Sequence, residues 1–91
     1  MFCVLLTIGP PGEDFRPLEA YEATVLPLLA DYGGERLVCL RHLDTGGETH
    51  LYAFPDEAAF NRYMADPARR RAAAPVDQAG ITTRYQPVVM L

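Results

Sequence analysis

The stretch FPDEAAFNRYMADP, residues 54–67, contains the end of a strand, the start of a helix and the end of that helix. Phe54-Pro55 ends the strand, because proline lacks the N–H group that a sheet ladder needs. Asp56 is placed to cap the helix, with Glu57 near its positive end. Asp66-Pro67 ends the helix and is placed to cap a short further helical turn. The side chains expected on the buried stripe are Ala59, Phe60, Tyr63 and Met64.

The segments before this unit predict two strands, a helix and a hairpin. Residues 2–8 (FCVLLTI) are an apolar run of strand length. A helix follows, with Asp14 as its N-cap, a kink at Pro27 and a stop at Gly33-Gly34. Its predicted buried stripe is Leu18, Tyr21, Val25, Leu28, Leu29 and Tyr32. Residues 35–43 and 49–54 form the second and third strands, joined by the turn residues DTGG.

The segments after the unit predict a loop over residues 75–80 and a last strand over residues 81–91. Pro87 places this strand at an edge of the sheet, because proline cannot donate to a central ladder. The predicted order is therefore β-α-β-β-α-β, the ferredoxin-like α+β fold, as one domain over residues 1–91. It consists of a four-stranded antiparallel sheet with two helices on one face, in which the first and third strands are central.

The strands are apolar on both sides, although two helices cover only one face of the sheet. In the first strand, Cys3 and Leu5 alternate with the other apolar residues, and the second strand places Val38 and Leu40 on its opposite side. A monomer rarely exposes such a patch. We therefore expect a homodimer through the sheet faces, since twofold dimers are the commonest oligomers.

Composition excludes several classes of function. Hydrophobic residues make up 49% of the chain and charged residues 22%, which is typical of a globular protein. A net charge of −4 argues against nucleic-acid and anionic-membrane partners. The chain has no lysine, so it has neither a Schiff-base lysine nor a P-loop. The apolar run near residue 1 is too short to span a membrane, and we expect a cytoplasmic protein.

The two cysteines, Cys3 and Cys39, lack metal-ligand spacing and lie in apolar runs, which favours small buried hydrophobes. The predicted strand order separates them by one strand, so they stand about 9–10 Å apart. That distance is too long for a disulfide. The three arginines at 69–71 are expected on a solvated surface rather than in an anion site, because consecutive helical residues point in different directions.

Tyr21, LPLLADYGG (residues 26–34) and FPDEAAFNRYMADP resemble the small proteins of the dimeric α/β-barrel superfamily, over nearly the whole chain. This superfamily includes antibiotic-biosynthesis monooxygenases, polyketide cyclases and muconolactone-isomerase-like proteins. The resemblance implies a dimeric α/β barrel that binds a small aromatic or polyketide-like molecule without a cofactor. It carries no catalytic signature, and the absence of tryptophan departs from the haem-degrading members.

Candidate catalytic residues lie near the predicted hairpin. His42 and His50 flank the turn, and we expect them nearly opposite each other, in a register that the loop length decides. Such a pair would suit proton transfer, since imidazole titrates near neutral pH. His50 is the first candidate for acid or base, because it shares a strand face with Tyr52 and Phe54. Tyr52 is the candidate catalytic hydrogen-bonding partner of His50, and His42 is the second choice for acid or base. A metal site would need a third ligand, and Glu48 is expected to be a solvated turn residue, so no metal is predicted.

The candidate substrate-binding residues are the remaining aromatic and polar side chains near the predicted cavity: Tyr21, Phe54, Asn61, Tyr63, Tyr85, Arg41 and Arg84. The tyrosines are equally compatible with amphipathic core positions.

Three functions stay open on these residues. The first is a cofactor-free monooxygenase or cyclase/isomerase, and the second is a non-catalytic dimer that binds or senses a metabolite, since both need the same pocket. The third is an RNA-recognition motif, which shares the order of elements and has alternating aromatics like Tyr52 and Phe54. The acidic balance counts against this third function.

Overall fold

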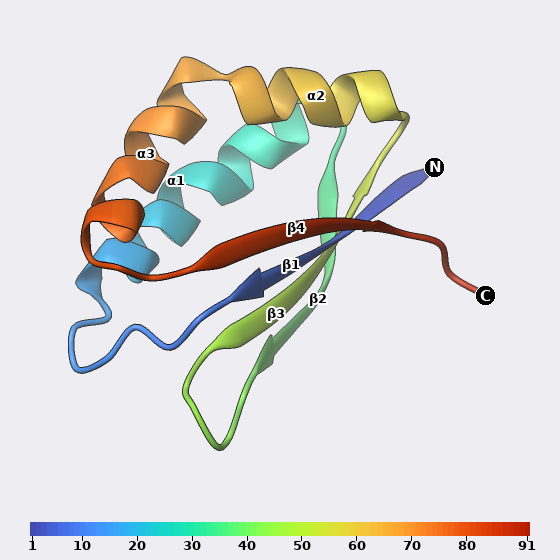
Figure 1. Cartoon of the computed structure of the whole chain (residues 1–91). Coiled ribbons are helices and arrows are strands. Elements are labelled where there is room, and N and C mark those ends of the chain that lie inside the picture. The colour runs from blue at the N-terminus through green and yellow to red at the C-terminus, as the bar shows by residue number, and fades with distance from the viewer.

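All 91 residues are described by the structure, a computed structural model, as a four-stranded antiparallel sheet with three helices on one face (Figure 1). The strand order β2-β3-β1-β4 places β1 and β3 in the centre, as predicted, and confirms the ferredoxin-like α+β fold. The elements in chain order are β1 (Phe2–Ile8), α1 (Arg16–Asp31), β2 (Glu35–Arg41), β3 (Glu48–Phe54), α2 (Glu57–Ala65), α3 (Pro67–Gln78) and β4 (Thr83–Val88).

The hydrogen bonds around α2 confirm the interpretation of residues 54–67. The Asp56 carboxylate accepts from the N–H of Ala59 at 2.8 Å and so caps α2. Asp66 caps α3 by accepting from the N–H groups of Ala68 and Arg69 at 2.7 and 3.3 Å. The Tyr32 hydroxyl donates to the same carboxylate at 2.6 Å. Asp66 therefore ties the end of α1 to the junction of α2 and α3.

The region after Asp66 differs from the prediction. The expected short turn is a helix of 12 residues, α3, and the loop predicted from Pro75 is wrong because α3 continues through Pro75 to Gln78. Proline removes only one N–H from the helix, and the next residue, Val76, is buried in the core, which favours continuation. Gly80, with φ +76°, follows the helix. The last strand is correspondingly shorter than predicted, from Thr83 to Val88.

Helix α1 has the predicted buried stripe but a different start. Leu18, Tyr21, Val25 and Leu29 are buried. Phe15 rather than Asp14 occupies the N-cap position. Asp14 still accepts from the N–H of Arg16 at 3.0 Å, so it satisfies one of the free amides of the first turn.

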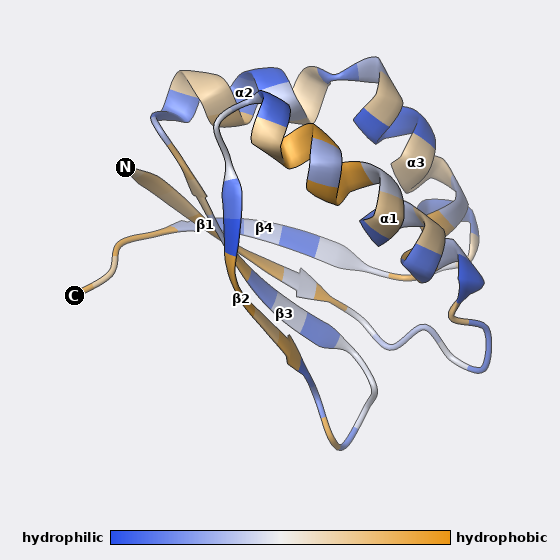
Figure 2. Ribbon diagram, turned by 180° about the vertical axis from the view of Figure 1, so that it is seen from behind, coloured by the Kyte–Doolittle hydropathy of each residue, from blue (hydrophilic) through white to orange (hydrophobic).

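The two faces of the sheet differ in how they are covered. On the helix side lies a core of 12 buried residues that includes Leu6, Ile8, Tyr52 and Phe54. The other face carries no helix (Figures 1 and 2). Tyr52 and Phe54 lie under the helices, whereas an RNA-recognition motif uses sheet aromatics to stack bases. The feature that suggested RNA binding is therefore absent.

The open face is apolar over its centre, as predicted. Its residues, by strand pairing, include Cys3 and Leu5 on β1, Leu51 and Ala53 on β3, Val38 and Leu40 on β2, and Val88 on β4. Leu40 is 55% exposed and Val38 39% exposed. Figure 2 shows this hydrophobic section of β2 and an equally hydrophobic C-terminal segment.

The two cysteines are free and lie on strands separated by β3. Cys3 is buried, but Cys39 is exposed, because β2 is an edge strand. The expectation that both are buried hydrophobes is thus wrong for Cys39. None of the helices is both long enough and apolar enough to cross a membrane.

Removal of the two capping carboxylates should destabilise the protein to different extents. We expect Asp56→Ala to lower the free energy of unfolding by about 1 kcal/mol, which is typical of a lost N-cap. Asp66→Ala should lower the free energy of unfolding by more, because this carboxylate accepts hydrogen bonds from both the first turn of α3 and the Tyr32 hydroxyl. Chemical denaturation followed by far-UV circular dichroism measures both. Asn61→Ala, on the exposed side of α2, is the control and should stay within about 0.5 kcal/mol of the native protein. Equal losses in all three variants would contradict the assignment.

Candidate functional site

A row of four side chains crosses the covered face of the sheet and separates two polar clusters. Strand pairing places Cys39 beside His50, His50 beside Leu6, and Leu6 beside Tyr85. Leu6 is fully buried, and it divides a tyrosine–arginine pocket on the β4 side from a histidine–carboxylate cluster on the β2 side. Helix α1 contributes to both, through Tyr21 and Glu22 respectively.

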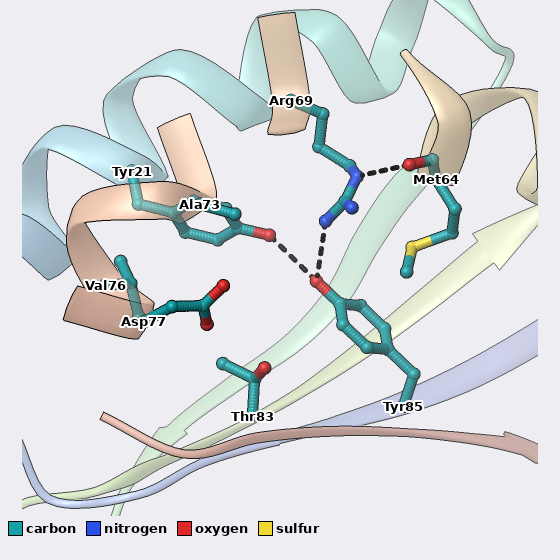
Figure 3. A pocket seen from close by; sticks show the side chains of 8 residues that line it. All are labelled: Tyr21, Met64, Arg69, Ala73, Val76, Asp77, Thr83 and Tyr85. Atoms are coloured by element: carbon teal, nitrogen blue, oxygen red, sulfur yellow. Dashed lines mark hydrogen bonds between the residues drawn. The ribbon is translucent and has the colours of Figure 1, made fainter. Parts of the chain in front are cut away.

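The pocket lies between α1, α3 and β4, and the Tyr85 hydroxyl is at its centre (Figure 3). The hydroxyls of Tyr21 and Tyr85 are 2.9 Å apart. Arg69 donates to the Tyr85 hydroxyl at 3.4 Å and to the Met64 carbonyl at 3.0 Å. The cavity has a volume of about 110 Å³, and its lining residues are Tyr21, Met64, Arg69, Ala73, Val76, Asp77, Thr83 and Tyr85. It therefore combines apolar walls with the Arg69 cation, the Asp77 carboxylate and the hydroxyl groups of Tyr21, Thr83 and Tyr85.

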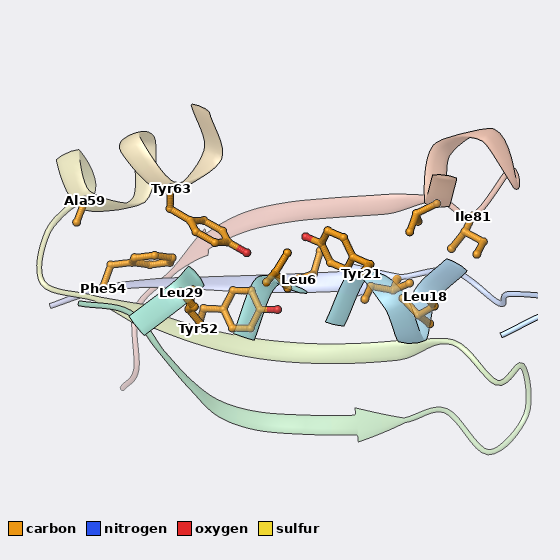
Figure 4. Close-up of a cluster of buried hydrophobic side chains, with 12 residues drawn as sticks. Leu6, Leu18, Tyr21, Leu29, Tyr52, Phe54, Ala59, Tyr63 and Ile81 are labelled. Atoms are coloured by element: carbon orange, nitrogen blue, oxygen red, sulfur yellow. The ribbon is translucent and has the colours of Figure 1, made fainter. Parts of the chain in front are cut away.

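A third tyrosine lies beside the pocket. The hydroxyls of Tyr21, Tyr52 and Tyr63 point toward the middle of the core (Figure 4). The Tyr63 hydroxyl is buried without a hydrogen-bond partner, and the Arg69 guanidinium lies 5.8 Å from the centre of the Tyr63 ring. Burial raises the pKa of Tyr52, Tyr63 and Tyr85, so all three phenols are neutral at physiological pH.

The second cluster is centred on His50, whose side chain is fully buried on β3. Its Nε2 atom lies 2.7 Å from Oε1 of Glu48 and 3.4 Å from Oε1 of Glu22. Its Nδ1 atom lies 3.2 Å from the hydroxyl of Tyr52. Arg41 donates to the second oxygen of Glu48 at 2.9 Å. Both ring nitrogens of His50 therefore have polar partners.

The charged groups in this cluster shift one another's pKa values. Burial alone would lower the pKa of His50, but the carboxylates of Glu22 and Glu48 outweigh burial and raise it. Burial alone would raise the pKa of Glu48, but hydrogen bonds from its neighbours, His50 and Arg41 among them, hold that pKa at about 2. The Glu48 carboxylate is therefore ionised near neutral pH, which favours the protonated imidazole beside it.

Glu48 corrects one expectation from the sequence. It was predicted to be a solvated turn residue, but it is the first residue of β3 and only 3% exposed. Cys39 lies beside it, with Sγ 3.6 Å from Nε2 of His50. Burial raises the pKa of the Cys39 thiol, and the Glu48 charge adds to this effect. One donor atom from each of Cys39, Glu48 and His50 lies within 4.8 Å of the others, an arrangement that can hold a metal ion.

The predicted pair of His42 and His50 does not form. The N–H of His42 donates to the carbonyl of Gly47 at 2.7 Å, which leaves a four-residue loop over residues 43–46. His42 thus lies opposite Gly47, whereas His50 lies opposite Cys39. The His42 ring contacts Thr49 at 2.6 Å, and Thr49 neighbours His50 in the strand and points to the opposite face. The turn starts directly after His42 and ends four residues before His50, so the strand register keeps the two imidazoles apart.

The remaining predicted residues divide between the two clusters and the surface. Tyr21 and Tyr85 line the pocket, and Tyr63 lies next to it. Phe54 packs on Phe60 and Tyr63 at the far end of the core and lines a second, shallower hollow of about 260 Å³. Arg41 belongs to the His50 cluster, and Asn61 and Arg84 are exposed. The acid–base role predicted for His50, with Tyr52 as its hydrogen-bonding partner, stays a prediction. Neither residue lines the pocket.

Sequence reasoning missed Arg69, which is only 9% exposed although it was expected on a solvated surface. A signal was present: Arg69, Ala73 and Val76 are spaced i, i+4, i+7 and face the same pocket. A second signal was the strand alternation of Glu48, His50 and Tyr52, which places all three on one face. Nothing in the sequence indicated that Glu22 would reach this face beside them.

Comparison with known proteins gives structural neighbours only. No protein-family model matches the chain, and no curated protein matches it. A putative antibiotic biosynthesis monooxygenase from Deinococcus radiodurans superposes with a TM-score of 0.76 at 14% identity, over 99% of this chain and 92% of that one. An uncharacterised NIPSNAP domain protein from Burkholderia xenovorans superposes with a TM-score of 0.70 at 15% identity, over 98% of this chain and 94% of that one. SnoaB, a cofactor-independent oxygenase from Streptomyces nogalater, superposes with a TM-score of 0.67 at 16% identity, over 99% of this chain and 92% of that one.

The chain shares their fold. This confirms the resemblance in architecture to antibiotic-biosynthesis monooxygenases that the sequence motifs indicated. Identities of 14–16% carry no residue roles from these proteins to this one.

Two tyrosine variants should have opposite effects on stability. Tyr63→Phe removes a buried hydroxyl that has no partner, so the free energy of unfolding should stay unchanged or rise by up to about 1 kcal/mol. Tyr85→Phe leaves the Tyr21 hydroxyl and Arg69 without a shared partner and should lower it by about 1 kcal/mol or more. Urea denaturation of the two variants side by side makes the comparison. A larger loss for Tyr63→Phe than for Tyr85→Phe would show that the Tyr63 hydroxyl is bonded in solution.

Proposed function

We propose that this protein binds a small, largely apolar, aromatic molecule between its helices and its sheet. The observation that supports the proposal is the convergence of the Arg69 guanidinium and the hydroxyls of Tyr21 and Tyr85 on one pocket with apolar walls. A few directed polar groups in an otherwise apolar cavity are typical of small-molecule sites. The fold agrees, because its neighbours include proteins named as oxygenases.

The size of the pocket limits the ligand. A volume of about 110 Å³ is well below the roughly 300–1,000 Å³ of ordinary ligand sites. A single aromatic ring is therefore the part of the ligand that the pocket is proposed to enclose. The guanidinium of Arg69 favours a ring that carries a phenol or another group able to accept a hydrogen bond. The Asp77 carboxylate in the same lining favours a neutral group over an anion.

We expect simple phenols to bind at this pocket, with 4-nitrophenol as the probe. Amide shifts in NMR spectra should change around Tyr21, Ala73 and Tyr85 on titration. Arg69→Gln should weaken binding about tenfold or more, since a hydrogen bond from a charged group contributes about 1.5–3 kcal/mol.

Arg70→Gln is the matched control, because Arg70 is the exposed neighbour of Arg69 on the same helix. The Arg70→Gln variant should bind 4-nitrophenol with the same affinity as the native protein. Shift changes scattered over the surface, or equal losses in the two arginine variants, would contradict the proposal. If the protein consumes oxygen when the phenol is bound and no cofactor is added, it is a cofactor-independent oxygenase as well as a binding protein. Binding without consumption or any other conversion of the phenol would favour the alternative, a metabolite-binding or sensing protein.

We further propose that the protein is a homodimer through its open sheet faces. The support is the exposed apolar surface of β2 together with Val89, Met90 and Leu91, which follow β4. A stable interface of this kind buries roughly 1,200–2,000 Å² in total. The pocket and the His50 cluster lie on the other side of the sheet, so pairing of the open faces leaves both of them uncovered.

One charge on the open face should separate the protomers. Sedimentation velocity at micromolar concentration should show a dimer for the native protein and a monomer for Leu40→Glu, because the substitution buries an unpaired carboxylate in the interface. Leu43→Glu is the matched control, since Leu43 is fully exposed in the hairpin loop, and it should stay dimeric. A monomeric native protein would overturn the proposal.

A further inference from the structure

Three donor atoms of different chemistry meet on the covered face where β2 pairs with β3. Cys39 Sγ and Glu48 Oε1 lie 3.6 and 2.7 Å from Nε2 of His50. One donor atom from each residue lies within 4.8 Å of the others. The three residues come from neighbouring positions of a hydrogen-bonded strand pair, so the backbone holds them in place before any ligand arrives. A thiol, an imidazole and a carboxylate are the ligand types that Zn²⁺ uses in proteins.

A fourth donor approaches from the helix layer. Oε1 of Glu22 lies 3.4 Å from Nε2 of His50, and this oxygen is buried without a hydrogen-bond partner. Its contact with His50 is an ion pair without hydrogen-bond geometry, so this oxygen has capacity to accept a further partner. It comes from α1 rather than from the strands, and it lies at the same nitrogen of His50 as the Cys39 and Glu48 donors.

His50 and Glu48 have hydrogen-bond partners of the kind that support metal ligands in proteins. A histidine that binds a metal through one nitrogen usually hydrogen-bonds through the other. Nδ1 of His50 has this partner in the Tyr52 hydroxyl, at 3.2 Å, which leaves Nε2 to face the cluster. Arg41 likewise holds Oε2 of Glu48 at 2.9 Å and leaves Oε1 toward His50.

We propose that Cys39, Glu48 and His50 bind a divalent first-row transition-metal ion, with Zn²⁺ as the best fit and the Glu22 carboxylate, 3.4 Å from His50, as the nearest side chain for the fourth position. Ligands placed 2.0–2.3 Å from a tetrahedral ion stand roughly 3.3–3.8 Å from one another. The separations of His50 Nε2 from the Cys39 sulfur and the Glu22 oxygen, 3.6 and 3.4 Å, meet this requirement. The Glu48 oxygen, at 2.7 Å, moves outward by roughly 0.7 Å when the ion replaces the hydrogen bond.

The location of Cys39 provides a route for the ion. Cys39 is exposed on the edge strand β2, whereas Glu48 and His50 are buried behind it. Binding converts the Cys39 thiol to a thiolate and the His50 imidazolium to a neutral imidazole, so it releases the thiol proton and the Nε2 proton, and the ion's positive charge compensates a site otherwise rich in carboxylate. The site is separate from the tyrosine–arginine pocket, so the inference does not rest on the proposed ligand of that pocket.

Metal titration of chelator-treated protein tests the proposal, with ZnCl₂ followed by calorimetry and CoCl₂ by absorbance. The native protein should bind one ion per chain, and cobalt should give a thiolate charge-transfer band. Cys39→Ser should remove that band and weaken Zn²⁺ binding more than about 100-fold, since loss of even a supporting residue costs about 10–100-fold. Tyr52→Phe should weaken binding about tenfold while leaving the band in place.

Cys3→Ser is the matched control, because Cys3 is the only other cysteine and lies on the opposite face of the sheet. It should keep both the band and the affinity. Absence of binding to the native protein at about 100 µM Zn²⁺ would overturn the proposal, and so would unchanged affinity in Cys39→Ser. Equal losses in the Cys3 and Cys39 variants would also overturn it. Circular dichroism of each variant separates lost binding from lost folding, and the exposed position of Cys39 makes that substitution mild for the fold.

Discussion

The position of α1 over the sheet is the constraint on which both polar clusters depend. Tyr21 and Glu22 are consecutive in this helix, and consecutive helical positions differ by about 100° around the axis. Tyr21 therefore reaches toward β4 and contacts Tyr85 at 2.9 Å, whereas Glu22 reaches toward β2 and lies 3.4 Å from His50. Leu6 fills the space between the two sides. A small rotation of α1 would weaken the pocket and the histidine cluster together.

Three charged or titratable residues, Glu48, His50 and Arg69, are buried in this small domain. Ninety-one residues bury a modest fraction of their surface, and polar groups taken out of water must find partners. Most of the buried groups do so, through the contacts of Tyr85, His50 and Glu48. Two buried side-chain atoms do not, the Tyr63 hydroxyl beside the pocket and Oε1 of Glu22 in the His50 cluster. Each cluster thus retains a buried polar atom without a hydrogen-bond partner, and such atoms are exceptions in folded proteins.

The fold could be predicted from the sequence because its signals are local. Caps such as Asp56 and strand alternation act within a few residues, and the strand order followed from the element order. The sites depend on distances that local patterns do not contain. Which of three consecutive arginines is buried depends on the rotation of α3 about its axis. The length of that helix was not predicted, because Pro75 is usually a sign that a helix ends. The separation of His42 from His50 depends on one loop length.

The two walls of the pocket differ in how firmly they are held. Its wall on the sheet side belongs to β4, which is paired along its length with the central strand β1. Its opposite wall belongs to α3, which packs on α1 and α2. The contact that joins the two walls is the Arg69–Tyr85 hydrogen bond, which at 3.4 Å is long and therefore weak. The wall formed by α3 is therefore tied less firmly to β4 than β4 is to β1. Arg69 supplies both this weak tie and the positive charge of the pocket, so the charged group of the pocket belongs to its less firmly held wall.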